Sequence, residues 1–350
     1  MLIVATLVSA LLSSPAAPSS SPTERPAAET TDVFASAFAA IPADPPPATT
    51  TRGEHYWIGN EDRLDLFYTD VQNKHGIHMG VGAEQNWVLC GWSRCDALVL
   101  MDFDQAIVDL HRVYVVAFAL APTRRAFLDL WLDRSRKGLR AGIITRYGGR
   151  EALAALKALD VARWSIERRF TRLEDGLTAR GVPSFLTDDA QYAWLHELVV
   201  RDRVVTVRGD LTAKKTVLAI AAAATRTGLP VRTLYLSNAE QYFSYNKQTR
   251  KNLTSLPLDA EGLVLRTHGS KALGHAEGGN RYHYGTQTAA SLTAFLSSTA
   301  VTSSHQILQW ATTTTEPGRS LQASTAPTAA REAWLAAKKS AGSSTKKKPT

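Results

Sequence analysis

Two stretches decide the fold, GIHMGVG at residues 76–82 and ALVLMDFD at residues 97–104. The first is a short apolar strand that runs into two glycines. The second is a continuous apolar run that ends in two aspartates, and such an unalternated run is typical of a strand buried on both faces of a parallel sheet. Residues 84–94 lie between the two stretches and have a helical pattern. This order predicts a parallel βαβ unit.

The alternation of strand and helix continues along the chain. Further strands are expected at residues 203–207, 231–236, 263–265 and 282–284. The early strands end in Gly, Asp, Ser or Asn, as strands that line a common crevice do. We therefore predict a Rossmann-like, class I methyltransferase-like α/β domain over residues 53–300, with a mostly parallel sheet. The long helical stretch at about residues 105–202 is predicted to be an insertion between strands two and three.

The chain begins with an apolar run, LIVATLVSALL at residues 2–12. Eleven residues are too few to cross a bilayer as a helix, but they suit the apolar core of a signal peptide. Ser14 and Ala16 supply small residues before a cleavage site, although no Lys or Arg precedes the run. We expect a signal peptide over residues 1–16, no transmembrane span, and export to the periplasm or medium. A cytoplasmic protein with a frayed apolar end is the alternative.

Two other segments are poor in core-forming residues. Eight of the fifteen prolines lie before residue 48, among Ala, Ser and Thr, which predicts a disordered linker over residues 17–52. Residues 301–350 are rich in Thr and Ser and then in Lys, and the five lysines of the last thirteen residues supply most of the net charge of +8. Such a tail is typical of a solubilising end. Nucleic acid is therefore not an expected partner.

The two cysteines, Cys90 and Cys95, are five positions apart. They either form a local disulfide in an oxidising compartment or remain two small buried thiols, and buried thiols are the favoured interpretation. No C-x-x-C pair or nearby His completes a zinc site around them. The histidines between residues 268 and 283 also lack the spacing of a metal site, so no metal is expected.

Gly80 and Gly82 lie where a strand meets a helix, so the backbone can turn sharply and present N–H groups to a ligand. Gln85 takes the place of the third glycine of a G-x-G-x-x-G pattern, and a ligand-free turn is the alternative. Asp102 follows Gly82 by twenty residues, which suits a carboxylate that accepts hydrogen bonds from ribose hydroxyls. Asp104 points the same way. We expect one carboxylate to contact a ligand and the other to cap the next helix.

Later strands end in further polar residues. Asp210 is placed either to contact an adenine amino group or to cap the next helix. Ser237 and Asn238 end the following strand, where a catalytic or substrate-orienting group commonly lies, with a helix cap as the alternative. Glu240 and Tyr242 fall in the next helical turn near the same crevice. Asn238, Glu240 and Tyr242 are therefore the candidate catalytic residues.

Four strings occur in a characteristic order, namely GVGAEQN at residues 80–86, GDL at 209–211, LYLSNAEQY at 234–242 and NLTSLPLD at 252–259. Together they resemble an uncharacterised bacterial family typified by a conserved Leptospira protein, over roughly residues 54–290. The resemblance implies a fold like that of S-adenosylmethionine-dependent methyltransferases, without an assigned reaction. It also implies a pocket lined by Gly80, Gly82, Gln85, Asn86, Asp102, Asp210, Ser237, Asn238, Glu240 and Tyr242. The sequence departs from the family pattern after strand two, where it lacks an Arg pair and has Asp104.

Two functions are compatible with this reading. The first is a methyltransferase that binds S-adenosylmethionine between the glycines and Asp102, in which positioning does most of the work because the sulfonium is already activated. The second is an exported, non-catalytic protein that keeps the fold and binds another small molecule or partner. Hydrolases and NTPases lose support because the sequence has no G-x-S-x-G, H-E-x-x-H or P-loop pattern.

Overall fold

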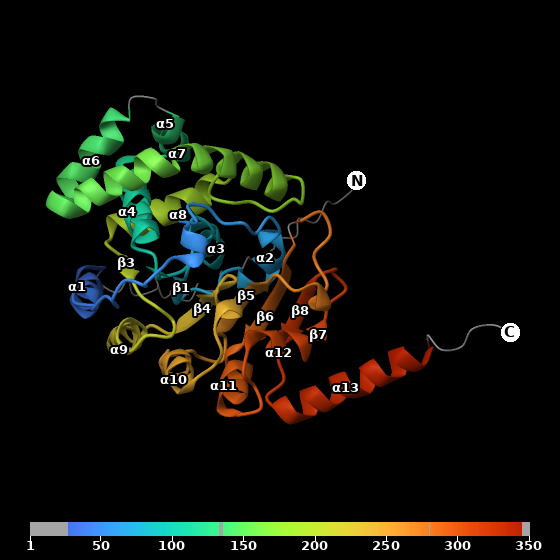
Figure 1. The fold of residues 1–350 in the computed structure, drawn as a ribbon. Helices are drawn as coiled ribbons and strands as arrows, with labels where there is room; N and C mark the ends of the chain where they lie inside the picture. Colours follow the sequence, from blue (N-terminus) through green and yellow to red (C-terminus); the bar gives the residue numbers. More distant parts are fainter. Residues whose placement is uncertain (1–26, 133–135, 280, 345–350) are drawn as a thin grey trace, which may run out of the picture.

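A sheet of eight strands lies between two layers of helices in the computed structural model, which describes residues 27–132, 136–279 and 281–344 (Figure 1). This is the Rossmann-like α/β architecture that the alternation of strand and helix predicted. The expected signal peptide at residues 1–16 lies outside the described residues. Among the described residues, none of the helices combines the length and the apolarity needed to cross a bilayer.

The strands are β1 (Ile77–Gly80), β2 (Ala97–Asp102), β3 (Val204–Arg208), β4 (Val231–Tyr235), β5 (Leu263–His268), β6 (His283–Thr288), β7 (Thr312–Thr313) and β8 (Arg319–Gln322). Their order across the sheet is β3-β2-β1-β4-β5-β6-β8-β7. The first five strands are mutually parallel, whereas β6 is antiparallel to β5. Every residue of β1 and β2 is buried, as their apolar runs predicted. The order reverses between β1 and β4, and ligand crevices of open parallel sheets form at such a switch point.

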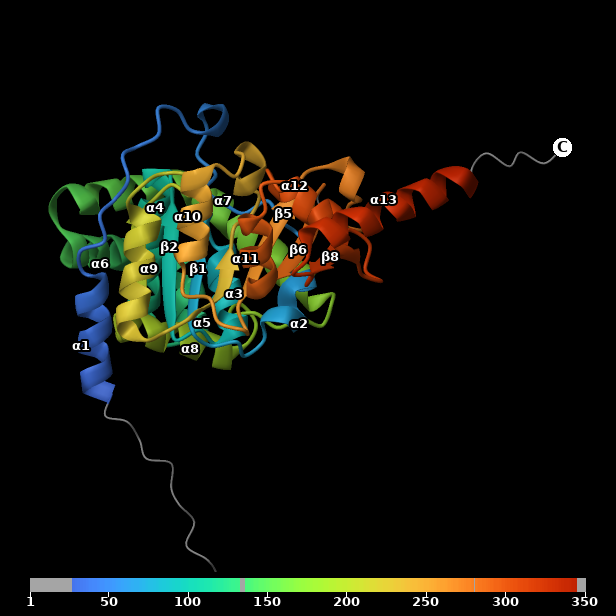
Figure 2. The same ribbon diagram turned by 90° about the horizontal axis from the view of Figure 1, so that it is seen from below.

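Helices cover both faces of this sheet. One face carries α2 (Tyr68–Val71), α3 (Gln85–Ser93), α4 (Gln105–Leu120), α5 (Arg124–Leu132), α6 (Lys137–Tyr147), α7 (Gly149–Thr178) and α8 (Asp189–Val200). The other face carries α1 (Ala27–Phe38), α9 (Thr216–Thr227), α10 (Lys247–Ser255), α11 (Ala289–Ser297) and α12 (Ser304–Gln309) (Figure 2). Two hydrophobic cores result, one on each face of the sheet.

Five helices, α4 to α8, separate β2 from β3 along the chain. α4 packs on β2 and β3, and α5, α6 and α7 lie farther from the sheet (Figure 1). Their core is aromatic, because the ring of Phe118 stacks on Trp87 at 4.6 Å and on Phe127 at 4.5 Å between centroids. Arg169 of α7 pairs with Glu84 at 2.7 Å, with both side chains fully buried. This ion pair fixes α7 against the residue that precedes α3.

Residues 27–50 differ from the expected linker. α1 lies against α9, and its side chains Phe34 and Phe38 stack at 4.5 Å and are almost fully buried. The guanidinium of Arg203 covers the ring of Phe34 at 4.9 Å. Two phenylalanines one helical turn apart give the Ala-rich segment an apolar face, and the prolines after α1 do not interrupt it. This corrects the expectation of disorder over residues 17–52 for the described part of that range.

The Thr/Ser-rich region near residue 310 is also more regular than its composition indicated. α12 begins with a capping box between Ser303 and Gln306, and β8 pairs with β6 and so extends the sheet. α13 (Pro327–Ser344) follows and projects from the body of the protein (Figure 2). This Thr/Ser-rich segment therefore contributes structure, and α13 includes Lys338 and Lys339 of the predicted tail.

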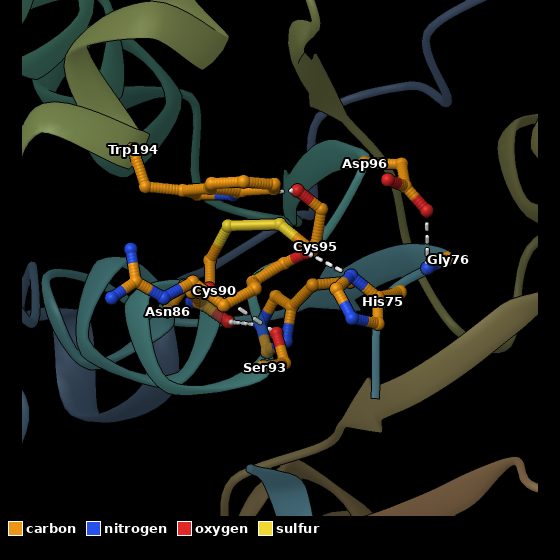
Figure 3. Close-up of a disulfide and its surroundings, with 10 residues drawn as sticks. His75, Gly76, Asn86, Cys90, Ser93, Cys95, Asp96 and Trp194 are labelled. Carbon is orange, nitrogen blue, oxygen red and sulfur yellow. Dashed lines mark hydrogen bonds between the residues drawn. A yellow bond between two sulfur atoms is a disulfide. The ribbon is translucent and has the colours of Figure 1, made fainter. Parts of the chain in front are cut away.

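Cys90 and Cys95 form a disulfide, which corrects the favoured interpretation of two free thiols (Figure 3). Arg94 ends α3 in the left-handed conformation, with φ of 50°, and this turn brings the two Cα atoms to 5.4 Å. Both cysteines are completely buried. Trp194 of α8 lies across them and donates from its indole nitrogen to the Cys95 carbonyl oxygen at 3.0 Å. The disulfide fixes the turn from α3 into β2.

Candidate functional site

A cavity of about 410 Å³ opens at the carboxyl ends of the central strands. Parallel strands end at one edge of a sheet, so residues that are distant in sequence meet there. The segment between residues 45 and 60 loops over this edge (Figure 2). Of the residues expected from the sequence, the lining includes Gly82, Gln85, Asp102, Asp104, Asp210, Ser237, Asn238 and Tyr242.

The turn from β1 into α3 requires both of its glycines. Gly82 has a positive φ of 88°, and an added Cβ at Gly80 would lie 1.8 Å from Oδ1 of Asn86. Asn86 donates from Nδ2 to the carbonyl oxygens of Val81 and Ala83. Gly80 and Asn86 therefore shape the loop from inside the core and do not contribute to the cavity lining.

Gln85 replaces the third glycine, and its side chain fills the space that this glycine would leave. Its Oε1 accepts from the Ala83 N–H at 3.1 Å, and an added Cβ at Gly82 or Gly59 would lie 2.8 Å from its amide. On the other side, buried His111 of α4 donates from Nε2 to the Gly82 carbonyl oxygen at 2.8 Å. Burial lowers the pKa of His111 to about 4, so the ring is neutral at physiological pH. The loop is thus held from both sides.

Asp102 ends β2, and its carboxylate bridges two loops. Oδ2 accepts from the Gly82 N–H and Oδ1 from the Asp104 N–H, each at 2.9 Å. The residue is 7% exposed, and burial raises the pKa of its carboxyl to about 6. The Phe103 backbone also hydrogen-bonds to this carboxylate, and since each carboxylate oxygen has two lone pairs, one lone pair is still available for a ligand. Because Asp102 lines the cavity, its carboxylate is placed to accept hydrogen bonds from a ligand.

Of the two aspartates Asp102 and Asp104, Asp104 is the one that caps a helix. Its Oδ1 accepts from the Ala106 N–H at 3.0 Å at the start of α4. Its Oδ2 lies 2.7 Å from Nδ1 of His55, which belongs to the segment over the cavity. Asp104 therefore caps α4, as expected for one of the two aspartates, and also attaches the covering segment to that helix.

Asp210 begins the loop between β3 and α9. Its Oδ1 accepts from the N–H and the hydroxyl of Thr212, each at 2.7 Å, so it caps a turn several residues before α9 starts. The backbone of this loop surrounds Asp44, which the sequence analysis missed. The Asp44 carboxylate is 1% exposed and accepts N–H groups from Asp210 at 3.1 Å, Lys215 at 3.2 Å and Thr216 at 3.4 Å. These bonds hold the chain that follows α1 on the edge of the sheet.

Ser237 follows β4 with a positive φ of 47°, which is uncommon for a residue other than glycine. Its hydroxyl donates to Oε1 of Glu61, a fully buried carboxylate that the sequence analysis also missed. The Thr267 hydroxyl donates to the same oxygen at 3.3 Å. Oε2 of Glu61 accepts from the Asn60 N–H at 3.1 Å and from Nε2 of Gln85 at 3.4 Å. Glu61 thus joins the end of β4 to β5 and to the loop after β1.

Asn238 belongs to a cluster of three side chains in the cavity wall. Nδ2 of Asn238 donates to the Tyr282 hydroxyl oxygen at 2.9 Å, and Nδ2 of Asn60 donates to the same oxygen at 2.7 Å. All three residues line the cavity, and we call them the tyrosine–amide cluster. Burial raises the pKa of Tyr282, so its hydroxyl stays protonated. Neither Tyr282 nor Asn60 was among the site residues expected from the sequence.

Glu240 and Tyr242, two of the candidate catalytic residues, have different environments. Tyr242 lines the cavity and is 58% exposed. Glu240 is 2% exposed, pairs with Arg266 of β5 at 2.5 Å and accepts from the Tyr245 hydroxyl at 2.6 Å. It is not part of the cavity lining. A buried arginine within a strand needs an acidic partner, which is the sequence signal for this ion pair.

The histidines near residue 275 make contacts within the protein. His283 hydrogen-bonds through Nδ1 with the Gly274 carbonyl oxygen at 3.1 Å and through Nε2 with the Ser320 hydroxyl at 2.9 Å. The ring of His268 lies 5.2 Å from that of His305. In the part of the chain that the structure describes, no three His, Cys, Asp or Glu side chains are grouped so as to hold a metal ion.

Residues 56–325 match a family model described as a domain of unknown function (DUF7790). The matched range contains all eight strands and the loops that end them, but not Arg52 and Glu54 of the segment over the cavity. No curated protein matches the chain. Because the match covers well over half of its length, the chain belongs to the DUF7790 family.

Proposed function

We propose that the protein binds S-adenosylmethionine in this cavity and transfers its methyl group to a small molecule. The charge of the lining supports this ligand, since Arg52 is opposed by the carboxylates of Glu54, Asp102, Asp104 and Asp210. S-adenosylmethionine carries a positive sulfonium and a positive amino group against a single carboxylate and is therefore a net cation, whereas dinucleotides and nucleoside triphosphates carry negative phosphates. An acidic cavity attracts the former and repels the latter.

The strand order supports a class I methyltransferase-like fold. β3-β2-β1-β4-β5 is the order of a doubly wound sheet, and antiparallel β6 distinguishes it from the six-stranded parallel order of dinucleotide-binding folds. The helices α4 to α8 would then be the insertion between strands two and three. In this arrangement Asp102 would accept hydrogen bonds from the ribose hydroxyls, and the loop that contains Asp210 would lie beside the adenine.

The bound sulfonium would supply a methyl group that needs no further activation. The residues of the protein would mainly position the acceptor and exclude water. The segment over the cavity suits the second task, because the Gly59 N–H donates to Glu84 at 2.9 Å and His55 contacts Asp104. On the β4 side of the cavity, Asn238 and Tyr242 are placed to contact the acceptor.

The observation that carries the proposal is an acidic cavity at the switch point, with Asp102 at the end of β2. Calorimetric titration with S-adenosylmethionine and its demethylated product should give micromolar binding, and NAD⁺ should not bind. Asp102→Ala should abolish binding, while Asp189→Asn, at a side chain that is 82% exposed on α8, should not change it. A well-folded protein that binds neither the cofactor nor its product would rule out the proposal.

A second candidate is an exported protein that uses the same cavity for another ligand and transfers no methyl group. The buried disulfide favours it, because disulfides persist in oxidising compartments whereas S-adenosylmethionine is made in the cytosol. N-terminal sequencing and fractionation of the protein from its native cell test this candidate. An intact Met1 in the cytosolic fraction would remove its main support, and cleavage after residue 16 would strengthen it.

A further inference from the structure

The cavity has two chemically different sides. The side at the ends of β1, β2 and β3 carries the buried carboxylates Asp102 and Asp104 and the half-buried carboxylate Asp210. The side at β4 and β6 is formed by Ser237, Asn238, Ala239, Tyr242, Phe243 and Tyr282, with Asn60 bonded to Tyr282. Of the described side chains that line this second side, none carries a formal charge. A ligand group that lies against it has no ionic partner there, which favours a neutral group.

The tyrosine–amide cluster presents a defined set of hydrogen-bonding groups. The Tyr282 oxygen has two lone pairs, and the amide groups of Asn60 and Asn238 occupy both of them. Its O–H proton is therefore left to donate, and among the described residues no side chain or carbonyl accepts it. The amide oxygens of Asn60 and Asn238 likewise receive no donor from the described residues. The cluster thus offers one donor with an acceptor on each side.

The ligand edge that complements this pattern has an acceptor atom beside an N–H donor. A ring nitrogen or carbonyl would accept from Tyr282, while a neighbouring amino group would donate to Asn238. Phe243 and the largely exposed Tyr242 add aromatic faces against which a flat ring can pack. Aminated nitrogen heterocycles and aromatic carboxamides have this shape and these groups.

The residues on the side of the cavity at β4 and β6 also limit which atom of the acceptor can attack the methyl group. A hydroxyl acceptor needs a base to remove its proton, and this side of the cavity has none among the described lining residues. A neutral nitrogen attacks with its own lone pair. As the nitrogen–carbon bond forms, the bond from the methyl carbon to sulfur breaks and its electron pair stays on sulfur, which becomes a neutral thioether. The positive charge passes to the attacking nitrogen: an amino nitrogen then releases an N–H proton to water, whereas a ring nitrogen has no proton to release and keeps the charge.

We propose that the methyl acceptor is a neutral, planar nitrogen compound with adjacent hydrogen-bond donor and acceptor groups, and that the tyrosine–amide cluster selects it. This inference rests on the proposed methyl transfer for its chemistry but not for its binding site. Tyr282 and Asn238 are the residues that determine specificity. Tyr282 donates to the acceptor atom of the ligand, and Asn238 accepts from the neighbouring amino group.

Binding of 4-aminopyrimidine to the full chain tests the proposal, with pyrimidine, phenol and putrescine as comparison probes. Saturation-transfer NMR should show 4-aminopyrimidine binding about tenfold more tightly than pyrimidine, which lacks the amino donor. Asn238→Ala should weaken 4-aminopyrimidine about tenfold and leave pyrimidine within about threefold of its wild-type affinity, because pyrimidine lacks the amino group that donates to Asn238. Tyr282→Phe is the second variant and should weaken both probes, since both have the ring nitrogen that accepts from Tyr282. Tyr68→Phe, on α2 away from the cavity, is the matched control.

The outcomes separate the two proposals. If S-adenosylmethionine binds and phenol or putrescine binds as well as 4-aminopyrimidine, methyl transfer stands and the inferred acceptor class is wrong. If 4-aminopyrimidine binds in a Tyr282-dependent way without any cofactor binding, the selective site stands and methyl transfer fails. If Tyr282→Phe and Asn238→Ala both fold, as judged by thermal unfolding, and both keep wild-type affinity for 4-aminopyrimidine, the cluster does not select the ligand.

Discussion

Two loops at the same edge of the sheet differ in what occupies their backbone N–H groups. The loop after β1, residues 80–84, contacts one oxygen of Asp102, and that side chain also lines the cavity. The loop after β3, residues 209–215, wraps around Asp44, which accepts three N–H groups and is 1% exposed. The loop after β1 therefore contacts a carboxylate, Asp102, that also faces the cavity, whereas the Asp44 side chain occupies the N–H groups of the loop after β3.

The loop after β3 resembles a phosphate-binding loop in its sequence, but its N–H groups bind a side chain of the protein itself. Gly209 and the run Lys-Lys-Thr at residues 214–216 have the spacing of a phosphate-binding loop, except that a lysine replaces the second glycine. Asp44 lies where such a loop holds phosphate, and the Thr216 hydroxyl donates to the Pro42 carbonyl oxygen at 2.8 Å. An anion of the protein therefore satisfies the backbone N–H groups of this loop, while its residues 209–212 still line the cavity.

Asp44→Ala should have the largest effect on stability. It removes the acceptor of three N–H groups, one buried and two partly buried, and we expect the free energy of unfolding to fall by about 4 kcal/mol. Asp44→Asn keeps one acceptor oxygen and should cost about 2 kcal/mol. Urea unfolding followed by circular dichroism measures both changes.

Asp189→Asn on the surface of α8 is the matched control for the Asp44 variants; it removes an exposed ion pair with Arg124 and should change stability by less than about 1 kcal/mol. Limited proteolysis adds a local readout, because loss of Asp44 should expose the segment at residues 45–53 to cleavage. If Asp44→Ala lowers the free energy of unfolding by less than about 1 kcal/mol, the two loops do not differ as described, because water then bonds the N–H groups of the loop after β3 as well as Asp44 does.

The sequence predicted those parts of the site that follow from strand order. Gly82, Asp102 and Ser237 meet because parallel strands share one carboxyl edge, and the buried apolar runs of β1 and β2 identified that edge. The roles of individual carboxylates were less predictable. Asp102 and Asp104 have the same local pattern, and only the tertiary partners made one of them a helix cap.

Residues that reach the site from distant segments gave no local signal. Asp44 contacts a loop that begins 165 positions later in the chain, and Asn60 meets Tyr282 across 222 positions. The proline content around residue 45 favoured a linker, and it concealed the apolar face that Phe34 and Phe38 give to α1. Contacts of this kind depend on the folded arrangement, which composition and periodicity do not encode.

Asp102→Asn should remove a pH dependence of stability. Burial raises the pKa of Asp102 from 3.8 to about 6, so the folded state binds this proton more tightly than the unfolded state does. The free energy of unfolding of the wild type therefore falls as the pH rises from about 4 to about 6. Relative to wild type, the variant should gain about 3 kcal/mol over this range.

Urea unfolding of both proteins at several pH values between 4 and 7 gives this difference. The acceptor oxygen lost in the variant lowers its stability by the same amount at every pH, so only the slope is diagnostic. A flat difference for Asp102→Asn would mean that this carboxylate is as well solvated as one on the surface.

Removal of the disulfide should have the smallest effect on stability. It tests whether the loop after β1 keeps its shape without the crosslink at the other end of α3. The double variant Cys90→Ala/Cys95→Ala is expected to lose about 2 kcal/mol of stability, because the crosslink closes a short loop. Affinity for S-adenosylmethionine should not change, since contacts of Asn86 and Gln85 hold the loop after β1 at the opposite end of α3. Urea unfolding measures the stability and calorimetric titration measures the affinity, both without a reducing agent. The same measurements with a reducing agent added to both proteins are the control. A parallel loss of affinity would show that the loop after β1, unlike the loop filled by Asp44, depends on the far end of its helix for its shape.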